Sequence, residues 1–330
     1  MAKTIYIFSN GTLFREGNTL CFKSEEGKRF LPVEDVQEIL VFGEVDINKR
    51  LLEFLSQNEI ILHYFSYYEY YMGSFYPREH YNSGFLILKQ AEHYLDEEKR
   101  IELARKFVAG ALQNMLQVLK YYHKRGVPLG EVIEKLTLAE ENVAQPSGIS
   151  ELMALEGNSR EEYYKAFDLI INNPDFVFAK RSRRPPKNNL NTLLSFCNSL
   201  LYTTVLSEIY KTHLDPRIGY LHATNFRRFT LNLDLAEIFK PLLVDRLIFS
   251  LVDKKIIQAN DFEKKTEGIL LKENGKKRIV EEYDKRLKTT IQHRKLGRKV
   301  SYRHIIRMEA YKLEKHLLGE AEYMPFVSLW

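Results

Sequence analysis

Short apolar runs separated by turn residues fill the first eighty positions and predict β-strands. Residues 3–8 alternate between polar and apolar, and the Asn10-Gly11 pair that follows is typical of a hairpin. Residues 48–56 instead place Leu51, Leu52 and Leu55 on one helical face. Many short strands with turns between them predict a small sandwich or a curled sheet. The further strands that we expect span residues 12–14, 19–22, 30–32, 37–42 and 60–65.

The pattern changes between Gly73 and Gly84, where Pro77-Arg78-Glu79 and Asn82-Ser83-Gly84 indicate a linker. Helical periodicity then dominates, apart from a hairpin expected between 268 and 279 around Asn274-Gly275. We therefore expect an α+β protein. A small N-terminal β-sandwich-like domain (1–76) and a linker (77–90) would precede a larger, all-helical C-terminal domain (91–330). The expected helices of that domain span 98–123, 129–138, 149–172, 191–214, 235–252, 280–292 and 302–318.

Composition indicates a folded protein of a reducing compartment. The chain has 330 residues, 45% of them apolar, which is enough to build two cores. Cys21 and Cys197 lie far apart and lack metal-ligand spacing, so they should be small buried thiols. We see no signal-peptide core, and the richest apolar run, residues 247–252, is too short to cross a bilayer. These features predict a soluble, cytoplasmic protein without a membrane partner.

The net charge is only +5, from 49 basic and 44 acidic residues, but the basic residues cluster. Residues 285–303 include eight basic residues and no acidic one, and a second cluster spans 180–187. One such run is more often a solvated helix face, whereas two runs near a carboxylate site favour a nucleic-acid partner. The basic residues that we expect to contact DNA are Lys180, Arg181, Arg183, Arg184, Lys187, Arg227, Arg228, Arg294, Lys295, Arg298 and Lys299.

Glu156 is a first candidate for chemistry. In helical spacing it falls one turn beyond Leu152 and Met153, within an apolar stripe that continues to Phe167. A carboxylate among core positions is costly unless it is paired or binds a cation. An ion pair with Arg160 at i+4 explains Glu156 about as well as a functional role does.

His222, Asp234 and Glu237 are further candidates. His222 follows Gly219-Tyr220-Leu221 in a segment between two expected helices, where functional residues often lie, although a lone histidine is more often structural. Asp234 and Glu237 point the same way on a helix, but Asp-x-x-Glu is also a capping box, which the spacing alone favours. Together, Glu156, His222 and Glu237 would suit Mn²⁺ or Mg²⁺.

Other chemistries have less support. The sequence contains no Walker loop, dinucleotide fingerprint or His-Glu-x-x-His motif. His304-Ile305-Ile306-Arg307 with Tyr311 matches the residue types of tyrosine recombinases, but all three side chains fall within about two helical turns. We interpret that match as chance.

Six blocks in order along the chain resemble the CRISPR-associated endonuclease and integrase family, the catalytic half of the spacer-acquisition pair. Each block is weak alone, whereas the order of the four C-terminal blocks is specific, and the resemblance covers essentially the whole chain. The blocks are Leu31 to Gly43, Ile60 to Phe65, Glu156-Gly157, Arg184 to Asn191 with Leu194-Ser195, Gly219 to His222, and Asp234 to Pro241.

The resemblance implies that Glu156, His222 and Glu237 hold Mn²⁺ or Mg²⁺, with Asp234 as an adjacent carboxylate. It implies action on double-stranded and branched DNA, in which the 3′-hydroxyl of a short duplex attacks a phosphodiester at a CRISPR repeat. It also implies a homodimer built through the β-domains and a small CRISPR-associated partner protein. Whether Asp234 reaches the metal stays open, as does the role of the tail from Glu320 to Trp330.

Two other functions stay open from the sequence. The first is a structure-selective nuclease, of DNA or RNA, with the same site and water as the acceptor. The second is a non-catalytic nucleic-acid scaffold in which Asp234 and Glu237 only cap a helix.

Overall fold

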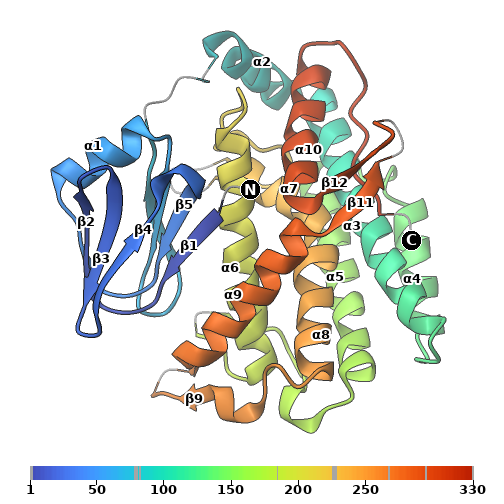
Figure 1. Ribbon diagram of the computed structural model, residues 1–330. Coiled ribbons are helices and arrows are strands. Elements are labelled where there is room, and N and C mark those ends of the chain that lie inside the picture. The colour runs from blue at the N-terminus through green and yellow to red at the C-terminus, as the bar shows by residue number, and fades with distance from the viewer. Residues whose placement is uncertain are drawn as a thin grey trace. The chain divides into compact units, whose positions relative to one another are not determined.

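The computed structural model describes residues 3–77, 81, 83–183, 185–224, 229–266, 268–293 and 296–328. The chain divides into two compact units, Met1–His80 and Tyr81–Trp330 (Figure 1). The first unit is built from strands and the second is mostly helical, which confirms the expected α+β class.

The first unit contains two four-stranded sheets that share one apolar core. One sheet has the order β1-β5-β7-β8, with β8 antiparallel to an otherwise parallel set, and the other has the order β4-β3-β2-β6. Helix α1 buries Leu51, Phe54 and Leu55 in the same core. The elements are β1 (Lys3–Ile7), β2 (Gly11–Glu16), β3 (Thr19–Ser24), β4 (Gly27–Leu31), the 3₁₀ helix η1 (Val33–Asp35), β5 (Val36–Val41), β6 (Val45–Asp46), α1 (Lys49–Gln57), β7 (Ile61–Phe65) and β8 (Tyr71–Phe75).

The hairpin expected at Asn10-Gly11 is wrong, because β1 and β2 belong to different sheets. Asn10 Oδ1 instead accepts a hydrogen bond from the Glu44 N–H (2.9 Å), and the Gly11 N–H donates to the Glu44 carbonyl (2.9 Å). A Cβ at Gly11 would lie 2.3 Å from the Lys23 carbonyl oxygen. The glycine therefore permits a close approach between strands rather than a two-residue turn.

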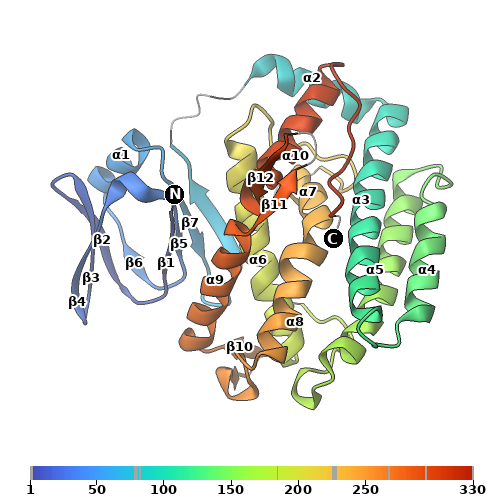
Figure 2. The ribbon, with the colours of Figure 1, turned by 45° about the vertical axis from the view of Figure 1, so that its right-hand side comes forward.

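The second unit is a bundle in which α3, α4 and α5 run side by side (Figure 2). Among the described residues, no helix is long and apolar enough to cross a membrane. The elements are α2 (Gly84–Leu95), α3 (Glu97–His123), α4 (Gly130–Glu141), α5 (Ile149–Ile171), η2 (Pro174–Phe176), α6 (Asn189–Tyr210), α7 (Thr230–Lys240), η3 (Pro241–Asp245), α8 (Arg246–Asp253), η4 (Ala259–Asp261), β9 (Phe262–Lys264), β10 (Ile269–Leu271), α9 (Glu273–Lys288), β11 (Thr290–His293), β12 (Arg298–Ser301) and α10 (Tyr302–Leu317).

Three expectations for this unit differ from the structure. Helix α2 begins at Gly84, inside the expected linker 77–90. Asn274-Gly275 lies in the first turn of α9 rather than in a hairpin. Strand β10 pairs with β9, which precedes it in the chain, and not with a strand after Asn274-Gly275. The expected helix 280–292 ends at Lys288, and residues 290–293 form a strand paired with β12. Two small hairpins therefore accompany the helices.

The expected helix 235–252 consists of three parts. Helix α7 runs to Lys240, a π-helical turn follows from Pro241 to Asp245, and α8 completes the run. Pro241 has no N–H to give to the Glu237 carbonyl, so the regular i+4 ladder is interrupted there. The proline therefore neither stops the helix nor starts a separate one.

Candidate active site

Three elements of the helical unit bring the candidate residues to one region. Helix α5 carries Glu156, helix α7 carries Asp234 and Glu237, and the segment between α6 and α7 carries His222. Both carboxylates of α7 are buried, whereas Glu156 is partly exposed.

Asp234 lies in a ring of backbone donors. Its Oδ2 accepts from the N–H groups of Tyr220 (2.6 Å) and Leu221 (3.1 Å), and its Oδ1 accepts from the His222 N–H (3.0 Å). Successive N–H groups that converge in this way make an anion-binding concavity. A Cβ at Gly219 would lie 2.8 Å from Asp234 Oδ2 and 2.5 Å from the Thr230 carbonyl carbon, so only glycine fits at the start of this turn.

The capping-box interpretation of Asp234 and Glu237 is wrong. Helix α7 begins at Thr230, with Phe229 as its N-cap, so Asp234 lies in the second turn and not at the helix start. Its carboxylate binds backbone N–H groups of the preceding loop instead of those of its own helix. Asp234 therefore joins the His222 loop to α7.

His222 is oriented by the same carboxylate. Its Nδ1 is 2.7 Å from Asp234 Oδ1. Burial opposes protonation of the ring, but the hydrogen bond and the charge of Asp234 outweigh it and raise the pKa of His222 above its ordinary value. A carboxylate on Nδ1 fixes the tautomer, which leaves the lone pair of Nε2 available to a ligand.

Arg160 connects the two glutamates. Its Nη2 donates to Glu237 Oε2 (2.7 Å), and its Nε lies 3.5 Å from Glu156 Oε1. Lys240, one turn after Glu237, donates to the other oxygen of that carboxylate. Burial would raise the pKa of the Glu237 carboxyl, but the charges of Lys240 and Arg160 outweigh it and lower that pKa to about 2. Glu237 is therefore ionised although it is buried.

The donor set fits a hard divalent cation. Two carboxylates and one imidazole are ligands that Mn²⁺ and Mg²⁺ accept. Glu237 and His222 influence each other's pKa, and Arg160 contacts both glutamates, so the three candidates lie within one electrostatic cluster. Among the described residues, however, no three acidic, histidine or cysteine side chains stand at ligating geometry. Arg160 and Lys240 hold the carboxylates instead, which places positive charge where a cation would.

The family model for CRISPR associated protein Cas1 matches residues 5–285. The chain belongs to the Cas1 family. It is 60% identical over 330 residues, the full length of both chains, to CRISPR-associated endonuclease Cas1 2 of Thermodesulfovibrio yellowstonii. It is also 54% identical over 318 residues to CRISPR-associated endonuclease Cas1 of Thermotoga maritima, which covers 96% of this chain and 98% of that one.

Solved structures agree with membership of the Cas1 family. A CAS1 protein of Thermotoga maritima superposes with a TM-score of 0.89 at 52% identity, covering 98% of this chain and 99% of that one. A casposase bound to an integration product has the same TM-score, 0.89, at 20% identity, and covers 99% of this chain and 93% of that one. The second likeness shows that the two proteins share the fold.

The basic residues of this Cas1-family chain play different structural parts. Arg181 is partly buried and donates to Asn191 Oδ1 (2.9 Å) and the Ser182 carbonyl (2.7 Å), which holds its loop together. Arg307, from the apparent recombinase match, donates to the buried Glu208 (2.7 Å). Of the residues expected to contact DNA, those with exposed side chains are Lys180, Arg183, Lys187, Arg298 and Lys299. Those that lie outside the described residues are Arg184, Arg227, Arg228, Arg294 and Lys295.

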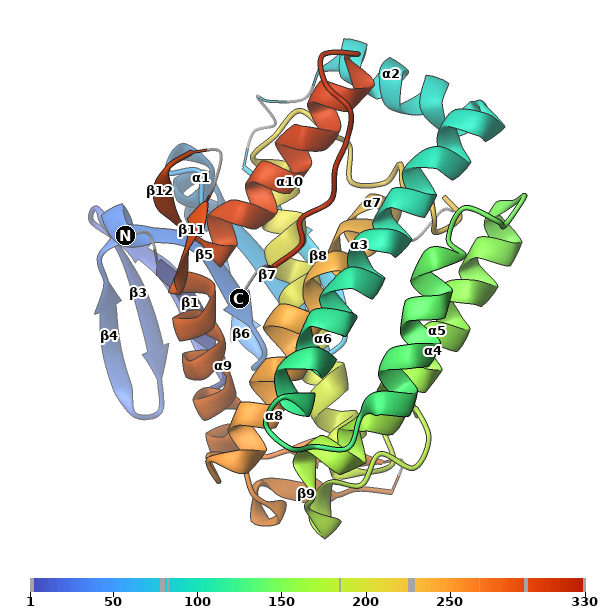
Figure 3. The ribbon, with the colours of Figure 1, turned by 90° about the vertical axis from the view of Figure 1, so that its right-hand side faces the viewer.

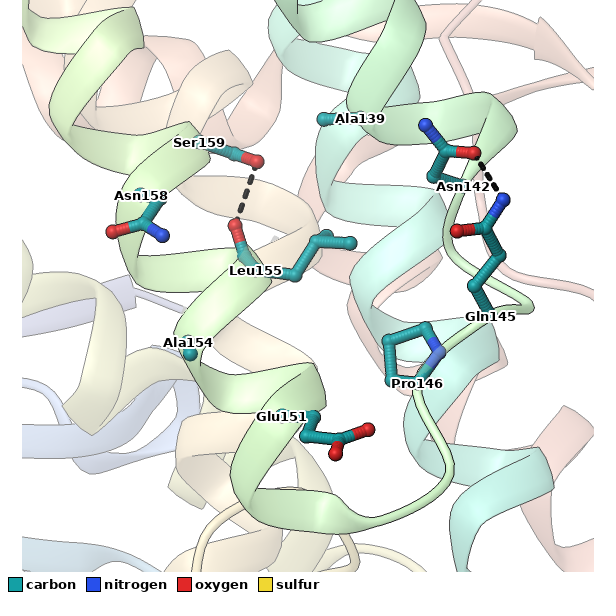
Figure 4. Close-up of a pocket in the computed structure, with 9 residues that line it drawn as sticks. All are labelled: Ala139, Asn142, Gln145, Pro146, Glu151, Ala154, Leu155, Asn158 and Ser159. Atoms are coloured by element: carbon teal, nitrogen blue, oxygen red, sulfur yellow. Dashed lines mark hydrogen bonds between the residues drawn. The ribbon is translucent and has the colours of Figure 1, made fainter.

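A pocket of ≈ 600 Å³ opens along α5 (Figure 4). Its walls come from the end of α4, the following loop and the first half of α5, and they include Leu155 and Asn158. Glu156, between these two residues in sequence, does not line it. The pocket is therefore separate from the carboxylate cluster of the Cas1-family chain.

Sequence patterns identified the candidate ligands but missed two buried charged residues that interact electrostatically with Glu237. Lys240 is three residues after Glu237, a spacing that suggests an ion pair, but burial of the pair gives no sequence signal. Asp245 is buried in the π-turn, where burial raises its pKa to about 7. The i+4 spacing predicts a contact of Arg160 with Glu156, whereas its shorter contact is with Glu237.

Proposed function

We propose that this chain is a metal-dependent DNA endonuclease and integrase that inserts short DNA duplexes into a CRISPR array. The observation that carries the proposal is one cluster of two carboxylates and an oriented imidazole, Glu156, Glu237 and His222, in a Cas1-family fold. Relatives with 60% and 54% identity are named endonucleases, which supports the nuclease part of the proposal.

Each side chain has a distinct role in this proposal. Glu156, Glu237 and Nε2 of His222 would hold Mn²⁺ or Mg²⁺. When bound, the cation would offset the charge that develops on the phosphoryl and leaving oxygens. Asp234 keeps the proton on Nδ1 of His222, so the lone pair of Nε2 is available. Arg160 and Lys240 hold the Glu237 carboxylate in one orientation.

The proposed reaction is a transesterification. The 3′-hydroxyl of the incoming duplex forms a new phosphorus–oxygen bond, and the bond to the leaving oxygen of the target strand breaks. The exposed lysines and arginines would contact phosphates without reading bases, so affinity should fall steeply with salt. Double-stranded and branched DNA are the substrates in this scheme.

The proposed assembly is a cytoplasmic homodimer that binds a small CRISPR-associated partner. Tyr64, Tyr67 and Met72 are exposed on the first unit, and aromatic residues are enriched at interfaces, which supports dimerisation there. Proteins of this fold were solved as a Cas6-RT-Cas1–Cas2 complex and as a TtCas1–DNA complex, at 18% and 14% identity. These two similarities concern the fold alone, and the partners of this chain are part of our proposal.

A strand-joining assay tests the function. Purified protein is incubated with a short duplex and a plasmid carrying a CRISPR repeat, and separately with branched DNA. The assays include Mn²⁺ or EDTA, with and without the small partner protein. We expect metal-dependent joining by the wild type and a loss of on the order of a hundredfold or more in His222→Ala and Glu237→Gln. His123→Ala, a histidine at the end of α3, is the matched control and should join normally.

Other outcomes select the alternatives. Cleavage without joining, even with the partner present, would identify a hydrolytic nuclease. Tight DNA binding without metal-dependent chemistry in the wild type would identify a scaffold. Normal joining by His222→Ala would remove that residue from the site.

A further inference from the structure

The C-terminal segment, residues 323–328, returns along the helical unit between α10 and α3 (Figure 3). Tyr323 is fully buried, and its hydroxyl donates to Glu309 Oε1 on α10 (2.6 Å). The Phe326 N–H donates to the same oxygen (3.0 Å). The segment is therefore docked through both a side chain and its backbone.

Asn114 of α3 joins this segment to α7. The side chain is fully buried, and its amide nitrogen donates to the Ile238 carbonyl of α7 (3.0 Å) and to the Phe326 carbonyl (2.8 Å). Its amide oxygen accepts from the Ser328 N–H (2.9 Å). One amide group thus connects α3, α7 and the C-terminal segment.

The contacts on α7 fall next to Glu237. Ile238 is the residue after it, and the Phe239 ring stacks on Phe326 with centroids 5.9 Å apart and planes at 13°. Pro241 cannot donate to the Glu237 carbonyl, so the end of α7 lacks one bond of its own ladder. Outside contacts therefore hold the turn of α7 that carries Glu237.

We propose that Asn114 is a positioning residue that couples docking of the C-terminal segment to the placement of Glu237. This inference rests on the proposed function, because it concerns a ligand of the proposed metal site. Removing the coupling should displace Glu237 by a fraction of a turn. Small misplacements in an active site reduce the rate of the chemical step far more than substrate binding.

Gly110 of α3 offers a way to undock the segment without altering α7. A Cβ at this position would lie 2.5 Å from Pro325 Cβ and 3.0 Å from Pro325 Cγ, but 3.6 Å from Ile238 Cγ1, an ordinary contact. Alanine also favours the helix over glycine, so Gly110→Ala should keep α3 folded. Gly130→Ala, on α4 with no atom within 4 Å of the added Cβ, is the matched control.

Three measurements are made on the two alanine variants and on Asn114→Leu. Hydrogen–deuterium exchange of the backbone amides of residues 323–328 reports on docking, because the Phe326 and Ser328 N–H groups are hydrogen-bonded in the docked segment. Initial rates of metal-dependent DNA chemistry give kcat and KM for DNA, together with the half-saturating Mn²⁺ concentration. Amide exchange of residues 323–328 is also recorded with and without Mg²⁺, which needs no activity.

We expect the amides of residues 323–328 to exchange faster in Gly110→Ala than in the wild type, and kcat to fall on the order of tenfold, with KM for DNA within twofold. The half-saturating Mn²⁺ concentration of Gly110→Ala should rise, and Gly130→Ala should match the wild type in every measurement. Mg²⁺ should slow this exchange in the wild type but not in Asn114→Leu, because coupling between two sites acts in both directions.

The inference is overturned if Gly110→Ala undocks the segment while kcat and the Mn²⁺ dependence stay within twofold of Gly130→Ala. It is equally overturned if Gly110→Ala leaves the amide exchange of residues 323–328 unchanged but lowers the rate. A wild type without DNA chemistry whose amide exchange still responds to Mg²⁺ would reject the proposed function and leave the coupling in place. If Asn114→Leu does not fold, Gly110→Ala alone decides.

Discussion

Asp234 and Glu237 are buried carboxylates one turn apart on the same helix, and their environments are opposite. Backbone N–H groups and an imidazole surround Asp234, whereas an arginine and a lysine hold Glu237. A carboxylate held by the backbone is fixed, because its donors cannot rotate away. A carboxylate held by side chains can exchange them for another cation. The geometry therefore favours an orienting role for Asp234 and a ligating role for Glu237.

The Gly219→Ala substitution tests the orienting role of Asp234. The added Cβ would press on Asp234 Oδ2 and on the Thr230 backbone, neither of which can move easily. We expect the free energy of unfolding to fall by about 1–3 kcal/mol. The DNA cleavage rate should fall by on the order of tenfold or more, because His222 loses its orientation. Urea denaturation and initial rates measure the two effects.

Gly84→Ala is the control for this substitution, since its added Cβ has no atom within 4 Å. A Gly219→Ala protein with normal stability and normal rate would contradict the tight packing of this turn.

Sequence spacing could identify single residues of the site but not their cross-helix partners. The Arg160–Glu156 pair at i+4 was an open alternative, and the structure confirms the contact. The contact between Arg160 and Glu237 joins positions 77 apart in the chain, which no local pattern reports. The role of Asp234 has no local pattern either. Its hydrogen-bond donors come from the loop before α7, whereas the spacing predicts a cap at the start of the helix.

At the element scale, the long helices were predictable and the small hairpins were not. Helices α3 and α5 begin and end within one residue of expectation, because their buried faces repeat with helical period over many turns. Strands β11 and β12 are four residues each and bury only Val300, so they carry little apolar pattern. Asn274-Gly275 carries a strong local turn pattern, but the prediction of a hairpin there is wrong. A dipeptide typical of turns can also occupy the first turn of a helix.

Arg160→Met tests how α5 and α7 are joined. It removes the guanidinium from a site where Glu237 is buried, so part of the Glu237 charge loses compensation. In EDTA we expect the free energy of unfolding to fall by about 3 kcal/mol. Added Mn²⁺ should raise the thermal midpoint more in Arg160→Met than in the wild type, because the cation no longer competes with Arg160.

Thermal unfolding with EDTA and with Mn²⁺ gives both values. Arg105→Met, whose Nη2 donates to the Pro146 carbonyl (2.6 Å) away from the glutamates, is the control for loss of a partly buried arginine. Equal midpoint shifts with Mn²⁺ in the wild type and Arg160→Met would contradict the competition.

At the scale of the whole molecule, the positions of the basic side chains matter more for binding a polyanion than the net charge does. The +5 total is small, and many basic residues are engaged within the fold, as Arg181 and Arg307 are. Sequence runs alone could not separate these residues from the exposed ones, because neighbours in a run point in different directions. Only the exposed basic residues are available to contact a polyanion.

The salt dependence of DNA binding tests that subset. In a Lys180→Ala/Arg183→Ala/Lys187→Ala variant, we expect the slope of log K against log salt to become shallower by about 0.9 for each lost phosphate contact. Lys28→Ala/Arg29→Ala/Lys49→Ala, in the first unit, removes the same charge and should leave the slope unchanged. Fluorescence anisotropy of a labelled duplex across a salt series gives both slopes. Equal slopes in the two variants would exclude the 180–187 cluster from DNA binding.

The two sheets of the first unit differ in how far apart their partners lie along the chain. Apart from the two-residue edge strand β6, one of these sheets consists of consecutive strands, β2 to β4. In the other sheet, Lys3 pairs with Val36 and Glu38 with Ile61. Closing a longer loop costs more chain entropy, so the hairpin sheet can form before the parallel one. During synthesis, β2 to β4 are made before β7, so the apolar face with Leu13 and Leu20 can form before β7 covers it. We therefore expect a transient half-formed sandwich, in which the nascent chain is most prone to aggregation.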